Sequence, residues 1–488
     1  MENGEKHTAL TARADRYIRE AWEKKPSDPW RLNYHFTPPA GWMNDPNGLI
    51  QYKGEYHLFY QYYPYDTQWG PMHWGHAKSP DCIRWEHLPV ALAPSEPYDA
   101  GGCWSGSAVD DHGTLTLVYS GNVGAEFDDG KGQRQCIAFS KDGIRFEKYE
   151  GNPVIAGIPP EGSHDFRDPK VWKHDGSWYA VVGSGKDGTG KALLYQSTDL
   201  RKWIYRGVAA QSDSILGTMW ECPDLFPLGD RHVLIVSPMW MQGHKNLYLL
   251  GDMDYETGRF TRERYAELDF GPDFYAAQTF LDDRGRRILI GWMTMWGTKM
   301  PTQAMGWAGA MTLPRVLELS GDGTLLCRPL PELAELRGIH ERFENLRLDP
   351  GGDSILEHWK GDSLEIELEM AAEPSGGLLK LELRRSADGT EKTVVSYNPQ
   401  TCMLSLDRSH SGQEMDGIFS CRLQPAPGSR VRLHVFLDRS SVEIFGNDGR
   451  AVLSARIYPG PDNLGLRLYC EKGAVEIRSL DIWGMHSA

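Results

Sequence analysis

The chain has 488 residues, of which 40% are hydrophobic and 24% are charged, a globular composition with room for one large domain and a smaller one. Its formal net charge of -15 opposes binding to nucleic acids and anionic lipid surfaces, and no apolar run is long enough to cross a bilayer. The eight cysteines lack the paired spacing of zinc sites, so we expect reduced and mostly buried thiols. The sequence therefore points to no nucleic-acid or membrane partner, no metal and no cofactor.

The first thirty residues are charged throughout and lack the apolar core of a secretory signal, which predicts a cytoplasmic protein. Leu10, Ala14, Ile18 and Trp22 recur at helical spacing within this stretch. We predict that residues 1–30 form an amphipathic helical extension that docks on the body of the protein.

The stretch "GWMNDPNGL", residues 41–49, places Asp45 between an asparagine and a proline. Asn, Asp, Pro and Gly are common turn formers, so on its own the stretch is typical of a surface turn. The alternative is a carboxylate that is held rigidly for chemistry.

Five stretches of the sequence share one outline: a short apolar segment, a polar turn with glycine, and a β-rich run. Their turn glycines are Gly54, Gly113, Gly176, Gly229 and Gly285. The spacing of roughly fifty to sixty-five residues is the scale of a propeller blade. Several strands per unit with hardly any helix between units predict a five-bladed β-propeller over residues 31–328.

Three acidic residues recur at one place in these units. Asp45, Asp168 and Glu221 each lie eight or nine residues before the turn glycine of their unit, and a proline follows each within two residues. The first strand of a propeller blade faces the central channel, so equivalent positions converge at one end of that channel. Independent turns would have no reason to keep this phase, which favours the catalytic interpretation of Asp45.

The sequence pattern changes after the fifth repeat. Residues 329–339 read as a linker helix, and residues 340–488 contain alternating strands that predict a β-sandwich. Asn447, Asp448 and Gly449 form a strong hairpin signal between two of these strands. The predicted fold class is all-β, with a propeller followed by a sandwich, and the sandwich has a packing or assembly role.

Converging carboxylates repel each other and need a metal, a substrate or a shared proton. A metal site is disfavoured because the dense loop of Asp and Asn ligands is absent, and a Cys222 nucleophile is disfavoured because no histidine partner is evident. Glycoside cleavage needs two acids with opposite tasks. Asp45 suits the attacking group, and Glu221, beside two anions, suits the proton donor.

"WMNDPNG", "FRDP" and "ECPD" together resemble the signature of glycoside hydrolase family 32, which includes invertases, sucrose-6-phosphate hydrolases, inulinases and levanases. The resemblance runs from His35 to "VFLDRSSVEIF" at residues 435–445. It implies double displacement with retention, with Asp45 as the nucleophile, Glu221 as the acid/base, and Asp168 holding fructose hydroxyls.

The same matching implies a set of sugar-pocket residues: Asn44, Gln61, Trp69, Trp104, Ser105, Arg167, Tyr275 and Trp296. For Trp69 and Trp296 core packing is the alternative, and for Gln61 and Tyr275 it is a structural hydrogen bond. For Arg167 the alternative is an ion pair with a neighbouring acid, which would also orient Asp168. Trp104 departs from the family pattern, which has phenylalanine there, so the preference for the leaving group stays open.

The implied function is a β-fructofuranosidase whose partner is a small sugar: sucrose, sucrose 6-phosphate or a short fructo-oligosaccharide. The sequence leaves a homodimer open. Four alternatives remain: an inverting propeller glycosidase of the arabinanase or xylosidase type, a transfructosylase, a fructan exo-hydrolase of the inulinase or levanase type, and a non-catalytic sugar-binding propeller.

Overall fold

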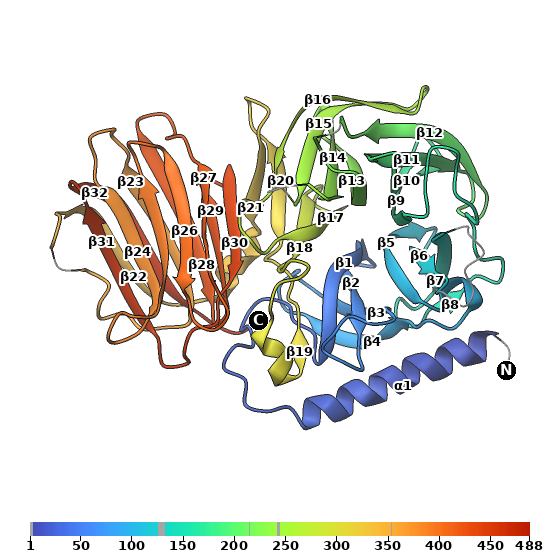
Figure 1. Ribbon diagram of the computed structural model, residues 1–488, viewed down its shortest axis with the longest axis horizontal. Helices are drawn as coiled ribbons and strands as arrows, with labels where there is room; N and C mark the ends of the chain where they lie inside the picture. The colour runs from blue at the N-terminus through green and yellow to red at the C-terminus, as the bar shows by residue number, and fades with distance from the viewer. Residues whose placement is uncertain (1–2, 125–131, 214, 242–244, 353) are drawn as a thin grey trace.

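The computed structural model describes residues 3–124, 132–213, 215–241, 245–352 and 354–488. It consists of a five-bladed propeller followed by a β-sandwich, which confirms the predicted fold class (Figure 1). The 3-10 helix η4 (Pro331–Leu336) connects the two bodies. Two further 3-10 helices are η1 (Pro97–Asp99) and η3 (Pro301–Met305).

The propeller is made of five blades of antiparallel strands, and the strands of each blade follow one another in the chain except that β19 interrupts the fifth. The first two blades comprise β1 (Gly41–Tyr52), β2 (Glu55–Tyr63), β3 (His73–Ser79) and β4 (Glu86–Leu92), then β5 (Gly102–Asp111), β6 (Thr114–Asn122), β7 (Arg134–Ser140) and β8 (Glu147–Lys148). The next two comprise β9 (Phe166–His174), β10 (Ser177–Lys186), β11 (Thr189–Ser197) and β12 (Trp203–Gln211), then β13 (Met219–Leu228), β14 (Arg231–Met239), β15 (Leu247–Asp254) and β16 (Arg259–Glu267). The fifth comprises β17 (Tyr275–Leu281), β18 (Arg287–Trp292), β20 (Arg315–Leu319) and β21 (Leu325–Pro329).

The ring closes because each innermost strand contacts its neighbours: β1 packs on β5, β5 on β9, β9 on β13, β13 on β17, and β17 on β1. The short strand β19 (Trp307–Ala308) adds to the closure by pairing in parallel with β1. Each predicted turn glycine joins the first two strands of its blade, with φ between 64° and 85°. Glycine adopts this left-handed conformation without the steric cost of a Cβ.

Every innermost strand carries a β-bulge near its start. Met43 pairs with Tyr62 and Pro46 with Tyr60, so Asn44 and Asp45 together oppose Gln61 alone. Shifts in register recur on β5, β9, β13 and β17. The stretch at 41–49 therefore lies in strand β1, and the surface-turn interpretation is wrong.

The bulges also correct the predicted phase of the three acids. Asp45 is the second unpaired residue of its bulge, Asp168 is the first, and Glu221 is the last paired residue before the bulge. The acids thus occupy three successive positions rather than one. A bulge turns adjacent side chains away from strict alternation, so successive positions can still face one opening.

The sandwich consists of two sheets that enclose an apolar core. One has the order β22 (Arg337–Leu348), β32 (Val475–Met485), β23 (Ser363–Ala371), β28 (Arg430–Asp438), β29 (Ser441–Gly446) and β30 (Ala451–Arg456). The other has the order β27 (Ile418–Arg422), β26 (Met403–His410), β25 (Lys392–Asn398), β24 (Leu378–Arg385) and β31 (Gly465–Glu471). Asn447, Asp448 and Gly449 all have positive φ between β29 and β30, as the hairpin signal predicts.

The helix α1 (Asn3–Glu23) lies along the first blade and contacts β4 (Figure 1). Ala14 is fully buried against the propeller, and Asp15 accepts a hydrogen bond from the Val90 N–H at 2.9 Å. Within the described ranges, no helix combines the length and the apolar character that crossing a lipid bilayer requires. All eight cysteines are free thiols, and all but Cys402 are buried, as expected.

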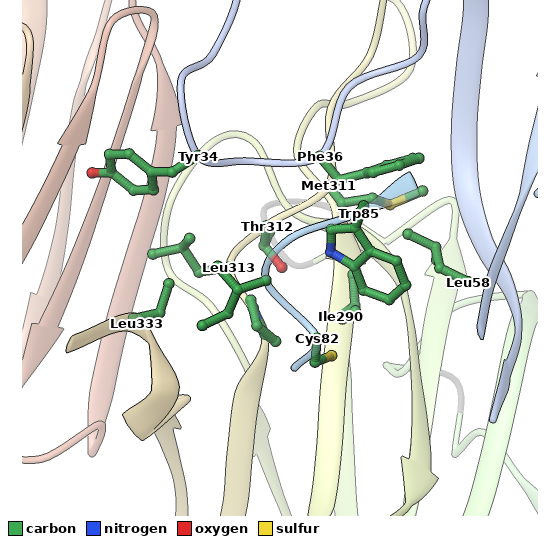
Figure 2. Close-up of a pocket in the computed structure, with 12 residues that line it drawn as sticks. Tyr34, Phe36, Leu58, Cys82, Trp85, Ile290, Met311, Thr312, Leu313 and Leu333 are labelled. Atoms are coloured by element: carbon green, nitrogen blue, oxygen red, sulfur yellow. The ribbon is translucent and has the colours of Figure 1, made fainter. Parts of the chain in front are cut away.

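Apolar side chains fill the junction between propeller and sandwich. Figure 2 shows that Tyr34 and Phe36, from the segment that precedes β1, line one cavity together with Leu313 of the fifth repeat and Leu333 of η4. The cavity that they enclose measures about 10 Å³, which is room for about one water molecule. This junction is therefore packing rather than a ligand site.

A buried ionic network crosses the same junction. The His35 ring lies between Asp438 and Glu443 of the sandwich, with Nδ1–Oδ2 and Nε2–Oε1 distances of 2.8 and 3.0 Å. Arg315 of the propeller contacts Glu443 at 2.6 Å and Asp269 at 2.9 Å. Burial alone would lower the pKa of His35, but the hydrogen bonds to the two carboxylates raise it from 6.5 to about 9.

The raised pKa of His35 predicts a pH-dependent stability. Because the folded protein holds this proton more tightly than the unfolded chain does, the contribution is complete below pH 6.5 and is lost as pH rises toward 9. The loss amounts to at most about 3 kcal/mol. Urea unfolding at pH 6, 7.5 and 9 measures it, and His35→Gln is the control because its amide does not titrate. Identical pH slopes for the wild type and the variant would contradict the assignment.

Candidate active site

The structure brings the three predicted acids together where the innermost strands begin. Asp45 comes from β1, Asp168 from β9 and Glu221 from β13. The Cys222 Sγ lies 3.5 Å from Asp45 Oδ2 and 3.6 Å from Asp168 Oδ2, so one thiol contacts both carboxylates. Arg167, the residue before Asp168, contacts Glu221. Residues far apart in sequence therefore form one cluster.

Asp45 is held by two side-chain donors. Ser105 Oγ donates to Oδ2 at 2.6 Å, and Asn44 Nδ2 donates to Oδ1 at 2.9 Å. Asn44 is oriented in turn by Trp42, whose indole N–H donates to the amide oxygen at 2.8 Å. Burial raises the pKa of Asp45 and the charge of Glu221 adds to this, while the two donors oppose it. Asp45 is only 8% exposed, and its carboxylate is fixed in orientation by these hydrogen bonds.

Asp168 lies at the first unpaired position of its bulge, with φ of 65°. Its Oδ2 accepts the Cys222 N–H at 3.0 Å, and its own N–H donates to Ser120 Oγ at 2.9 Å. Burial raises the pKa of Asp168 to about 7; Arg167 opposes this rise, and Glu221 and Asp45 add to it. Asp168 can therefore carry or release a proton near neutral pH.

Glu221 faces the opening, with 17% of its side chain exposed. Arg167 donates from Nη2 and Nε to Oε1 at 2.9 and 3.1 Å, and Tyr275 donates from its hydroxyl to Oε2 at 2.5 Å. Burial, together with the charge of Glu221, raises the pKa of Tyr275, so its hydroxyl stays protonated as a donor. Arg167 also contacts Asp165 at 2.7 Å. Both oxygens of Glu221 are thus fixed.

Tryptophan side chains surround this cluster. Trp69 is 45% exposed and Trp296 is 43% exposed, so neither is a core residue, contrary to the packing alternative. Trp104 lies edge-on to Trp69 at 6.2 Å, and the Arg167 guanidinium lies 5.7 Å from the Trp104 ring centre. Trp296 stacks on Trp42 at 6.0 Å. Aromatic faces of this kind suit the apolar faces of a sugar.

The predicted pocket residue Gln61 lies on β2, opposite the bulge that carries Asp45. The Gln61 side chain is buried and donates to the Cys103 carbonyl at 3.0 Å, linking the first blade to the second. This is the structural hydrogen bond that the sequence offered as the alternative. The orienting role of Trp42 and the bridging role of Cys222 were missed, although both residues lie within motifs that the sequence analysis singled out.

The described residues contain one group of carboxylates and histidine with metal-ligand spacing, and it lies in the sandwich: Glu365, Glu367 and His434. The Arg337 guanidinium contacts Glu365 at 2.7 Å and Glu367 at 2.5 Å, so a protein cation already pairs with both carboxylates. This group is therefore explained as an ion pair.

Comparison with known proteins identifies one family along nearly the whole chain. Residues 35–329 match the glycosyl hydrolases family 32 N-terminal domain, and residues 332–484 match the family 32 C-terminal domain. The chain is 42% identical to a sucrose-6-phosphate hydrolase of Escherichia coli over 468 residues (92% of this chain, 94% of the relative). It is 44% identical to one of Zymomonas mobilis over 500 residues (96% and 95%).

Two solved structures show the same architecture. A Bombyx mori GH32 beta-fructofuranosidase, solved as a mutant in complex with sucrose, aligns with a TM-score of 0.82 and 36% identity over 98% of both chains. The sucrose-6-phosphate hydrolase from Lactobacillus gasseri aligns with a TM-score of 0.87 and 29% identity, over 97% of this chain and 96% of that one.

The surroundings of Cys222 predict that it is unreactive. Burial, with the charges of Asp168 and Asp45, raises the pKa of the thiol well above its usual range, so little thiolate forms at neutral pH. Native protein treated with iodoacetamide at pH 8 should be labelled at the partly exposed Cys402 at least tenfold faster than at Cys222. Peptide mass spectrometry measures both rates, with urea-unfolded protein as the control. Comparable labelling of the two cysteines would overturn the prediction.

Proposed function

Because the chain belongs to glycoside hydrolase family 32, we propose that it is a retaining β-fructofuranosidase that works by double displacement. The observation that carries the proposal is the cluster itself. The three acids gather where the innermost strands begin, and we call this place the catalytic mouth. Asp45 is buried there and fixed by hydrogen bonds, while Glu221 faces the opening. One acid thus suits attack and the other suits proton transfer.

In the first step, an Asp45 oxygen attacks the anomeric carbon of the fructosyl unit. The bond from that carbon to the leaving oxygen breaks, and Glu221 in its acid form donates a proton to that oxygen. Ser105 and Asn44 hold the nucleophile in one orientation, which lowers the entropic cost of attack. The products are an ester on Asp45 and the released leaving group.

In the second step, water takes the place of the leaving group. Glu221, now ionised, accepts a proton from the water as its oxygen bonds to the anomeric carbon, and the ester bond to Asp45 breaks. Arg167 and Tyr275 position the carboxylate for both steps.

Asp168 has the position of a substrate-binding acid. Its carboxylate accepts the Cys222 N–H and also contacts the Cys222 thiol, which in turn contacts the nucleophile Asp45. It can accept hydrogen bonds from two sugar hydroxyls, and these bonds strengthen as positive charge develops on the fructosyl ring.

The residues of the mouth favour sucrose over its 6-phosphate. Arg167 is the described cation nearest to Glu221, and two carboxylates already neutralise it. A phosphate would need a cation that is free to pair with it. Trp69, Trp104 and Trp296 instead offer faces for neutral sugars. A cytoplasmic enzyme that hydrolyses imported sucrose is consistent with this choice.

Substitution of the two acids separates their roles. Asp45→Asn should reduce kcat on sucrose at least 10⁴-fold, as roughly expected for loss of a nucleophile. Glu221→Gln should reduce turnover of sucrose by about 10²- to 10⁴-fold but that of β-fructosyl fluoride far less, because fluoride leaves without a proton. The exposed Glu256→Gln is the matched control, and thermal melting checks folding. An equal loss on both substrates would argue against Glu221 as the acid.

A side-by-side assay of sucrose, sucrose 6-phosphate, kestose, inulin and levan tests the substrate preference. We expect the highest kcat/KM on sucrose, lower values on sucrose 6-phosphate and kestose, and little activity on the polymers. NMR of the first-formed fructose anomer should show retention, and free glucose and fructose should appear in equal amounts. Excess free glucose would indicate transfer to a sugar acceptor, and a higher kcat/KM on sucrose 6-phosphate would reverse the proposed preference.

A further inference from the structure

A second cavity lies between α1 and the first blade and measures about 510 Å³. Its walls come from α1, from Tyr60 and Tyr62 of β2, from Gly75 of β3, and from β4. Side chains alternate along a strand, so Tyr60 and Tyr62 lie on the face of the blade opposite to Gln61. The cavity is therefore separate from the catalytic mouth, and its volume is within the range of small-ligand sites.

Aromatic rings form much of this cavity. Tyr60 and Tyr62 pack edge-on to each other at 5.3 Å. A Cβ on Gly75 would lie 2.2 Å from the Tyr60 ring, so glycine is what allows this ring its position. The Trp22 ring closes the α1 side and is itself fixed by Lys25, whose Nζ lies 3.0 Å from the ring centre.

Polar groups in the wall are left for a ligand. Tyr60 is 98% buried, yet its hydroxyl has no hydrogen-bond partner among the residues that the structure describes. Asp15 uses Oδ1 for the Val90 N–H, which leaves Oδ2 available. His87 of β4 also lines the cavity and is itself exposed to solvent.

We propose that this cavity binds a neutral monosaccharide, such as glucose or fructose, at a site separate from the catalytic centre. Sugar hydroxyls donate and accept, and the wall offers both functions: Asp15 accepts, Arg19 donates, and Tyr60 and His87 can do either. The opposite charges of Asp15 and Arg19 cancel, which favours a neutral ligand over a phosphate. The apolar face of a sugar ring would pack on the tyrosines.

Calorimetric titration of the full-length protein with glucose, fructose and inorganic phosphate tests the proposal. Saturable binding of glucose or fructose is expected, and Tyr60→Phe should weaken it about five- to tenfold, the effect of one hydrogen bond. Leu88→Trp, which fills the cavity from β4, should abolish it. Tyr265→Phe is the matched control, because it removes the hydroxyl of an exposed tyrosine on β16, and it should change nothing.

The same variants separate this site from the catalytic one. Sugar bound in the catalytic mouth would be insensitive to Tyr60→Phe and Leu88→Trp, and that result, like preferential binding of phosphate, would overturn the proposal. If Leu88→Trp fails to fold, the Tyr60→Phe titration still decides. The readout is binding rather than turnover, so the outcome is independent of whether sucrose proves to be the substrate.

Discussion

Three carboxylates in one buried mouth repel one another, and the rest of the site compensates for this repulsion. Each acid has its own hydrogen-bond donors: two side chains for Asp45, a backbone N–H for Asp168, and a guanidinium and a phenol for Glu221. The compensation is unequal, since Asp45 and Asp168 are buried with raised pKa values, whereas Glu221 pairs directly with Arg167. That inequality distinguishes the acids, which share the same functional group.

The bulges explain how a regular propeller produces this inequality. A strand without bulges would present every second residue to the channel, and equivalent acids would then face each other symmetrically. Here the position of the acid relative to its bulge moves by one residue from Asp45 to Asp168, and by one more from Asp168 to Glu221. The fold repeats five times, but the local backbone places each carboxylate at a different depth and beside different donors.

The sequence predicted the parts that rest on local chemistry. Turn glycines need a left-handed backbone, so Gly54 and its equivalents reveal the repeat, and the motif around Asp45 reveals the mouth. Contacts between blades could not be predicted from the sequence. Nothing near Cys222 indicates that its thiol would bridge two aspartates, and the one-residue shifts depend on pairing with a neighbouring strand. The cavity under α1 likewise depends on how a helix docks.

The sandwich acts on the catalytic mouth through the segment that leads into β1. The Asp438 carboxylate accepts the backbone N–H groups of Asn33, Tyr34 and His35 at 2.7, 2.9 and 3.1 Å, in addition to the His35 ring. These bonds fix the chain ten residues before Asp45, in a buried place where a lost partner would leave several donors unsatisfied. A domain that contributes no residue to the acid cluster thereby helps to hold its nucleophile in place.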